Sequence, residues 1–256
     1  MPVPCHCQSL NSYRNCLKLK QNHYFRWFLE NNLAIARFVY SKGNGNMKGT
    51  MKIRTFICGI LAIVCGLTGC STIVSGLYGI KKIKTVDEKT IVHYSEKYNI
   101  PLSDSYELDS SYIGFLNAID TTRYKVQRQN HYQPLQMLYY DNTGVLKSFQ
   151  INCYAGGFPN LRWDRNGLLA AFPPKSQAPV DSILSFEKQI TFLRLLSQSK
   201  KFSADSCDFF VVVYWNRFMG RQSKRMIRFV QDNIKLATPK KVKVIYVNND
   251  NFFSRH

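Results

Sequence analysis

The chain has 256 residues, of which 45% are apolar and 14% are aromatic. A chain of this length and composition buries at least one sizeable core, which excludes an intrinsically disordered protein. The formal net charge of +19 by itself favours nucleic acid or an anionic membrane surface as a partner. The positive charge is spread along the chain. Residues 1–69 hold 9 basic residues (Lys or Arg) and one acidic residue, and residues 70–256 hold 26 basic and 15 acidic residues.

Residues 1–50 are predicted to be either an upstream extension that results from a wrongly placed start codon or a disordered basic segment. Met47 and Met51 both offer natural starts. The alternative is a zinc site in this segment, whose candidate ligands are Cys5, Cys7, Cys16 and His23. Their spacing matches no standard pattern of paired zinc ligands, so no metal is expected.

Residues 51–69 have the pattern of a secretory signal peptide. A short basic start at Met51–Arg54 is followed by an apolar stretch at 55–66 (TFICGILAIVCG) of the length that secretion requires. The run Leu67-Thr68-Gly69-Cys70 comes directly after it. This run resembles the lipobox of bacterial lipoproteins, in which a small residue precedes an invariant cysteine.

The resemblance implies that Cys70 is the first residue of the mature protein and that its thiol and amino group carry acyl chains. Several acyl chains, at ~0.8 kcal/mol for each buried methylene, form an anchor that does not readily dissociate. Membrane lipid is then the implied partner and the cell envelope the location. Ser71 is typical of lipoproteins sent to the outer membrane.

The alternative to a signal peptide is a membrane-spanning helix with a basic domain facing the cytoplasm. No charged residue occurs between Arg54 and Lys81, and a stretch of that length could cross a bilayer. Four glycines lower the hydrophobicity of its second half. Basic residues flank both ends, so the stretch lacks the charge asymmetry that orients a membrane-spanning helix.

The mature chain begins with a predicted lipid-anchored tether at 70–85, followed by one α/β domain at 86–256. In that domain, 87–98 (DEKTIVHYSEKY) has acids first and apolar residues at helical spacing, which predicts a helix. Residues 110–119 predict a second, short helix with a serine cap. No repeat with a period of 20 to 50 residues is found.

Two aromatic and β-branched stretches, 135–140 and 145–151, predict a β-hairpin, because Asp141-Asn142-Thr143-Gly144 between them supplies turn residues. Residues 153–174 are rich in Gly, Pro and Asn. They predict either a long ordered loop around a buried Trp163 or a strand with bulges.

The C-terminal third alternates helix and strand patterns. Apolar spacing predicts an amphipathic helix at 181–197 and another at 221–236. The continuous apolar run 209–215 (FFVVVYW) predicts a strand buried on both faces, and 241–247 (KVKVIYV) predicts a further strand. Strand, helix and strand in succession predict a parallel pair, and therefore an α/β fold with a mixed sheet.

The segment 211–224 (VVVYWNRFMGRQSK) resembles the core of the thioredoxin family, in which a buried strand leads to a Cys-x-x-Cys motif at the start of the next helix. Met219 takes the position of the nucleophilic cysteine and Gln222 that of the resolving cysteine. Thiol-disulfide exchange needs a thiolate and a second thiol, which a thioether and an amide do not supply. The resemblance implies a three-layer thioredoxin-like sandwich that binds a partner and is not an enzyme. The alternative is an ordinary βαβ unit.

A second segment, 133–146 (QPLQMLYYDNTGVL), resembles the part of thioredoxin in which a cis-proline leads into an edge hairpin. In thioredoxins this part follows the parallel strand pair, whereas here it precedes it. The domain is therefore circularly permuted, or the match is coincidence. If the match holds, it implies that Pro134 is cis and faces Met219 and Gln222.

Cys153 and Cys207 are the remaining thiols of the mature chain. A structural disulfide between them suits an extracytoplasmic protein. Two unpaired buried thiols are the second possibility. A displaced redox pair, which would make the chain a thiol-disulfide oxidoreductase, is the third.

The C-terminal third also carries a basic set, namely Arg217, Arg221, Lys224, Arg225, Arg228, Lys240, Lys241 and Lys243. It is either a solvated face or a contact with phospholipid head groups, lipopolysaccharide phosphates or nucleic acid. Nucleic acid is not expected for an extracytoplasmic protein. An unidentified envelope protein is the other expected partner, and neither a cofactor nor a catalytic residue is expected.

Overall fold

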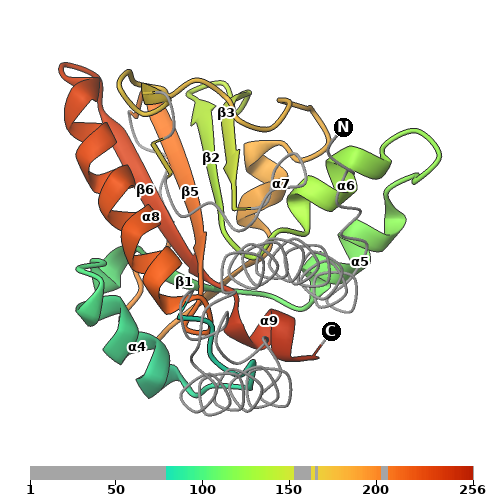
Figure 1. Ribbon diagram of the computed structural model, residues 1–256, viewed down its shortest axis with the longest axis vertical. Coiled ribbons are helices and arrows are strands. Elements are labelled where there is room, and N and C mark those ends of the chain that lie inside the picture. The colour runs from blue at the N-terminus through green and yellow to red at the C-terminus, as the bar shows by residue number, and fades with distance from the viewer. Residues whose placement is uncertain (1–78, 153–162, 165–166, 203–206, 256) are drawn as a thin grey trace, which may run out of the picture. The chain divides into compact units, whose positions relative to one another are not determined.

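The computed structural model of the protein describes residues 79–152, 163–164, 167–202 and 207–255. A six-stranded sheet in the order β3-β2-β5-β6-β1-β4 has helices on both of its faces (Figure 1). The predicted α/β class with a mixed sheet is therefore confirmed. The signal peptide and Cys70 were predicted within residues 1–78, which lie outside the described residues.

The centre of the sheet is the predicted strand, helix and strand. β5 (Phe209–Trp215) pairs in parallel with β6 (Val242–Asn248), and α8 (Gly220–Asn233) connects them. α8 buries Met226, Ile227 and Val230 against the sheet. This confirms the parallel pair and the amphipathic helix between its strands.

The predicted hairpin is also confirmed. β2 (Gln136–Asp141) and β3 (Leu146–Ile151) are antiparallel, and β2 pairs with β5 on its other side, again antiparallel. In the turn, Asp141 Oδ1 accepts hydrogen bonds from the backbone N–H of Thr143 and of Val145, each at 3.0 Å. Gly144 has a φ of 79°, which glycine adopts without a steric cost.

The other side of the sheet differs from the prediction. β1 (Ser105–Leu108) is parallel to β6, and β4 (Leu193–Leu195) pairs with the outer edge of β1 in the antiparallel sense. The helix predicted at 181–197 is therefore wrong, since only α7 (Phe186–Ile190) is helical there. The apolar spacing fits a helix, but the open edge of β1 takes Leu193–Leu195 as a strand, and tertiary pairing overrides local propensity.

Neighbouring residues of β5 point to opposite faces of the sheet and contact different helix layers. The Trp215 ring meets Tyr98, the C-cap of α4 (Glu88–Lys97), at 5.6 Å between centroids. The Tyr214 ring lies 6.0 Å from Tyr112 of α5 (Ser111–Ala118). Figure 1 shows α4 and α8 on one face, and α5, α6 (Lys125–His131) and α7 on the other.

The two predicted N-terminal helices are confirmed as α4 and α5. The predicted serine cap of α5 is wrong, because the side chain of Ser110 makes no capping bond and Asp109 Oδ1 accepts from Ser111 N instead, at 2.8 Å.

Trp163 is buried, as one of the two interpretations of residues 153–174 expects. Among the described residues, no helix is long and apolar enough to cross a bilayer.

A buried hydrogen bond between two side chains joins α6 to the segment before α7. His131 Nε2 lies 3.0 Å from Asp181 Oδ1, the imidazole is fully buried, and its ring stacks on Phe149 at 4.9 Å. Asp181 Oδ1 also accepts from Ile183 N at 3.1 Å. One carboxylate therefore holds two segments that are 50 residues apart.

Replacing Asp181 with alanine is expected to destabilise the protein by about 1–3 kcal/mol, because it leaves a buried imidazole nitrogen without its partner. Urea denaturation measures the change. Asp232→Ala is the matched control, since Asp232 pairs with Lys235 at the surface and such a pair contributes about 0–1 kcal/mol. Equal losses in the two variants would contradict a structural role for the buried pair.

Candidate functional site

The parallel strands β5, β6 and β1 end at the same edge of the sheet, the edge at which open α/β sheets hold their ligands. Buried polar residues gather there from four elements. We call them the carboxyl-edge cluster, which consists of Glu107, Asn216, Arg217, Gln222, Ser223, Asn248, Asn249, Asp250 and Asn251.

Asn216 is the centre of this cluster. Its amide Nδ2 donates to Pro134 O at 3.0 Å and to Asn249 Oδ1 at 3.1 Å, and its Oδ1 accepts from Met219 N at 2.8 Å. Asn249 Nδ2 donates to the same Pro134 carbonyl at 2.9 Å. The ends of β5 and β6 and the entry to β2 are thus joined by two amide side chains.

Asp250 begins α9 (Asp250–Arg255) and is buried. Its Oδ2 accepts from Arg217 N at 2.6 Å and from Asn248 Nδ2 at 3.0 Å. Its Oδ1 has no hydrogen-bond partner among the described residues. Burial raises the pKa of this carboxyl, although the backbone N–H and the charge of Arg217 act in the opposite direction.

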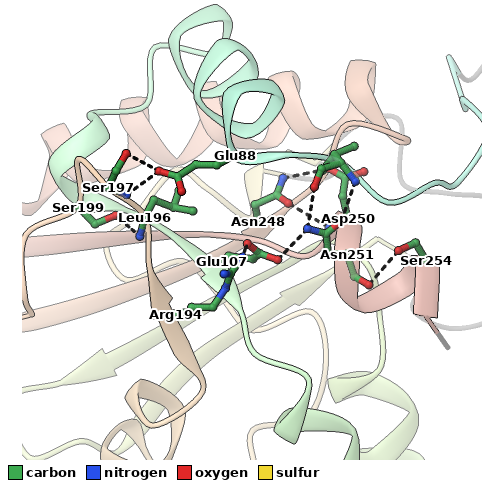
Figure 2. Close-up of polar contacts among 11 residues, drawn as sticks. Glu88, Glu107, Arg194, Leu196, Ser197, Ser199, Asn248, Asp250, Asn251 and Ser254 are labelled. Atoms are coloured by element: carbon green, nitrogen blue, oxygen red, sulfur yellow. Dashed lines mark hydrogen bonds and ion pairs between the residues drawn. The ribbon is translucent and has the colours of Figure 1, made fainter.

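Asn251 joins the cluster to the segment that precedes α4 (Figure 2). Its Oδ1 accepts from Val86 N at 2.8 Å, and its Nδ2 donates to Val86 O at 2.9 Å and to Glu107 Oε1 at 2.8 Å. Glu107 in turn pairs with Arg194 of β4. Both backbone groups of Val86 are therefore satisfied by one side chain.

Residues 79–87, which we call the lead segment, lie on the start of α8. Lys81 N donates to Phe218 O at 2.7 Å, and Arg217 Nη2 donates to Lys82 O at 2.8 Å. The residues predicted as the end of the tether thus dock on the domain. They dock at the carboxyl edge, beside the segment that resembles thioredoxin.

The two positions that the resemblance assigns to redox cysteines are closed to solvent. Met219 and Gln222 are each 1% exposed, and neither amide atom of the Gln222 side chain has a hydrogen-bond partner among the described residues. α4 packs closely on this point, since a Cβ added at Gly220 would lie 2.9 Å from the Tyr98 hydroxyl. The positions therefore present no reactive atom at the surface.

The prediction that Pro134 is cis is wrong, because the cis peptide bonds of the described residues precede Pro173 and Pro239. The chain enters β2 through a turn in which Gln133 N donates to Asn130 O at 3.2 Å, and this turn is made without a cis bond. Pro134 nevertheless lies beside the loop that begins α8, since its carbonyl and the Met219 N–H share the Asn216 side chain.

Cys207 lies at the opposite edge of the sheet. It is half-buried before the amino end of β5 and lines a cavity of about 400 Å³ together with Phe186, Phe202 and Phe210. The seven residues of β5 separate it from the start of α8 by about 20 Å. Cys153 lies outside the described residues, so the disulfide with Cys207 stays a prediction.

Sequence reasoning missed most of this cluster. The signal that was present is the run Asn248-Asn249-Asp250-Asn251, which directly follows the strand predicted at 241–247. Arg217, predicted to lie on a basic face, is only 8% exposed and belongs to the cluster instead. In the part of the chain that the structure describes, no three His, Cys, Asp or Glu side chains are grouped to hold a metal ion.

Comparisons of the chain with protein-family models, with curated proteins and with solved structures find no match in any of the three.

The raised pKa of Asp250 predicts a pH dependence of stability. The folded chain holds this proton more tightly than the unfolded chain, so the wild type loses stability as the pH rises from the ordinary value of 3.8 through the raised pKa. The free energy of unfolding of the wild type, relative to Asp250→Asn, is expected to fall over that range. Urea denaturation at a series of pH values measures it.

Asp141→Asn is the control with the opposite sign. Partial burial alone would raise the pKa of Asp141, but hydrogen bonds from Lys147, Thr143 and Val145 lower it to about 2. Relative to this variant, the wild type is expected to lose stability as the pH falls below 3.8 toward 2. Two pH profiles of the same sign would refute the assignment.

Proposed function

We propose that this chain is a lipid-anchored protein of the cell envelope. Its domain has a thioredoxin-like topology and acts as a binding module without thiol chemistry. The observation that carries the proposal is the position of Met219 and Gln222, which are buried at the start of α8 directly behind the central strand β5. Redox function at this point of the fold would require two accessible sulfurs.

The arrangement of β2, β3, β5 and β6 supports the topology. The hairpin of β2 and β3 lies on one side of β5 and the parallel strand β6 on the other. This brings Pro134 to the loop that begins α8, which the resemblance implies although the hairpin comes earlier in the chain. The domain is then a thioredoxin-like sheet with its hairpin permuted and with β4 added at one edge.

The course of the lead segment determines which edge of the sheet an anchor at Cys70 would hold near the bilayer. Cys70 precedes Gly79 by nine residues, and the chain from Gly79 onward lies on the carboxyl edge. Nine extended residues reach at most about 30 Å. An acylated Cys70 would therefore hold this edge near the bilayer and leave the opposite edge, with Cys207, farther from it.

The mass of the N-terminal peptide of the protein isolated from bacterial membranes tests the anchor. The expected result is a peptide that begins at Cys70 and carries the added mass of a diacylglyceryl group and an amide-linked acyl chain. Cys70→Ala is the control, and it is expected to remain unprocessed. A peptide that starts upstream of Cys70 without acyl mass would refute the anchor and favour a membrane-spanning segment.

An insulin-reduction assay tests the absence of thiol chemistry. The protein is expected to show no turnover above the dithiothreitol background, because the Cys-x-x-Cys positions hold a thioether and an amide. The matched variant replaces Cys153 and Cys207 with serine. Turnover by the wild type that this variant lacks would contradict a binding module and identify the displaced cysteine pair as the active thiols.

A further inference from the structure

Seven basic side chains are exposed along the lead segment and the first half of α8. We call them the basic surface, which consists of Lys81, Lys82, Lys84, Arg221, Lys224, Arg225 and Arg228. No acidic residue occurs within 79–86 or 217–231. Asp87 is the one acidic residue of the lead segment, so the two segments together carry a large excess of positive charge.

The four α8 members lie on one side of the helix, because positions 224, 225 and 228 follow position 221 by three, four and seven residues. The opposite side of α8 is the buried one, with Met226, Ile227 and Val230 against the sheet. The stripe runs about 10 Å along the helix axis.

The lead segment packs against the start of this stripe. The backbone N–H of Lys81 donates a hydrogen bond to the carbonyl of Phe218 at 2.7 Å. Gly79 lies against Arg221, since a Cβ added at Gly79 would be 3.2 Å from three carbons of the Arg221 side chain. The Lys81 ammonium donates to the Tyr94 hydroxyl at 2.9 Å, which holds it on the face of α4. The lysines and arginines thus occupy neighbouring positions although about 140 residues separate them.

We propose that the basic surface docks on the anionic phospholipid surface of the bilayer that carries the anchor. This inference rests on the proposed anchor, because at most about 30 Å of chain separates Cys70 from Gly79. At physiological salt, charges attract within a Debye length of about 8 Å, and each basic residue near an anionic bilayer strengthens binding about fivefold. The short connection raises the effective concentration of the bilayer at this surface.

Docking in this way orients the domain. The carboxyl edge and the exposed side of α8 face the lipid, and the amino edge, where Cys207 and its cavity lie, faces away from it. A protein partner then finds the amino edge accessible. Nucleic acid shares the charge preference, but no nucleic acid is held within reach of the lead segment as a bilayer is by the anchor.

Vesicle sedimentation tests the proposal with the chain 71–256, which lacks Cys70 and keeps every residue that the structure describes. Vesicles of phosphatidylcholine are compared with vesicles that also contain phosphatidylglycerol. We expect binding to the anionic vesicles only, weakened by added salt. The triple variant K224Q/R225Q/R228Q is expected to bind them about a hundredfold more weakly, at about fivefold for each residue.

The matched control is K200Q/K201Q/K241Q, which removes the same charge from exposed residues ahead of β5 and β6, at the opposite edge. It is expected to change binding less than a few-fold. An equal loss of vesicle binding in both triple variants would overturn the proposal, because binding would then depend on the net charge of the protein and not on the basic surface. Equal binding to neutral vesicles, or tighter binding to a duplex oligonucleotide than to anionic vesicles, would also overturn it.

Thermal unfolding of each variant verifies that it is folded before vesicles are added. Failure of the anchor remains distinguishable, because it appears as a missing acyl mass on Cys70 and does not alter vesicle binding by the unacylated chain. Failure of docking leaves the acyl mass in place and appears only in the comparison of the two triple variants.

Discussion

The burial of β5 on both faces is the constraint on which the rest of the structure depends. From Phe210 to Trp215 every side chain is buried, so each face of the sheet needs a helix layer and each backbone edge needs a partner strand. β2 and β6 supply the two edges, and the alternation of Tyr214 and Trp215 directs aromatic rings into both layers. The remaining elements cover this central strand.

The same burial explains why the carboxyl edge is so polar. Where the chain leaves a fully buried strand, its backbone N–H and C=O groups still need hydrogen-bond partners until the chain reaches solvent. A buried backbone group without a partner costs about 1–3 kcal/mol. Asn216, Asn249 and Asn251 meet this need with side-chain amides, which donate and accept at once. Because these amides also bind Val86 and the loop before α8, the lead segment and the start of α8 share one edge of the sheet.

Most of the regular elements could be predicted because their patterns are local. The turn at Asp141–Gly144, the amphipathic α8 and the apolar β5 each carry their signal within a few residues. The helix predicted at 181–197 failed because β1, about 90 residues earlier in the chain, takes Leu193–Leu195 as its edge partner. β1 itself has four residues, too few for a period to be detected. Of the candidate site, the resemblance of residues 211–224 and 133–146 to thioredoxin segments pointed to Met219, Gln222 and Pro134. It predicted neither their burial nor the side-chain amides around them.

The sequence by itself determined the α/β class, the hairpin, the parallel pair and the absence of cysteines at the start of α8. All of these follow from residue identity and short-range periodicity. Only the tertiary structure decided that Val86 meets Asn251, 165 residues away, that Asp181 reaches His131, and that the lead segment lies beside Arg221. Such contacts join residues that share no local pattern, because they depend on where the sheet brings distant strand ends together.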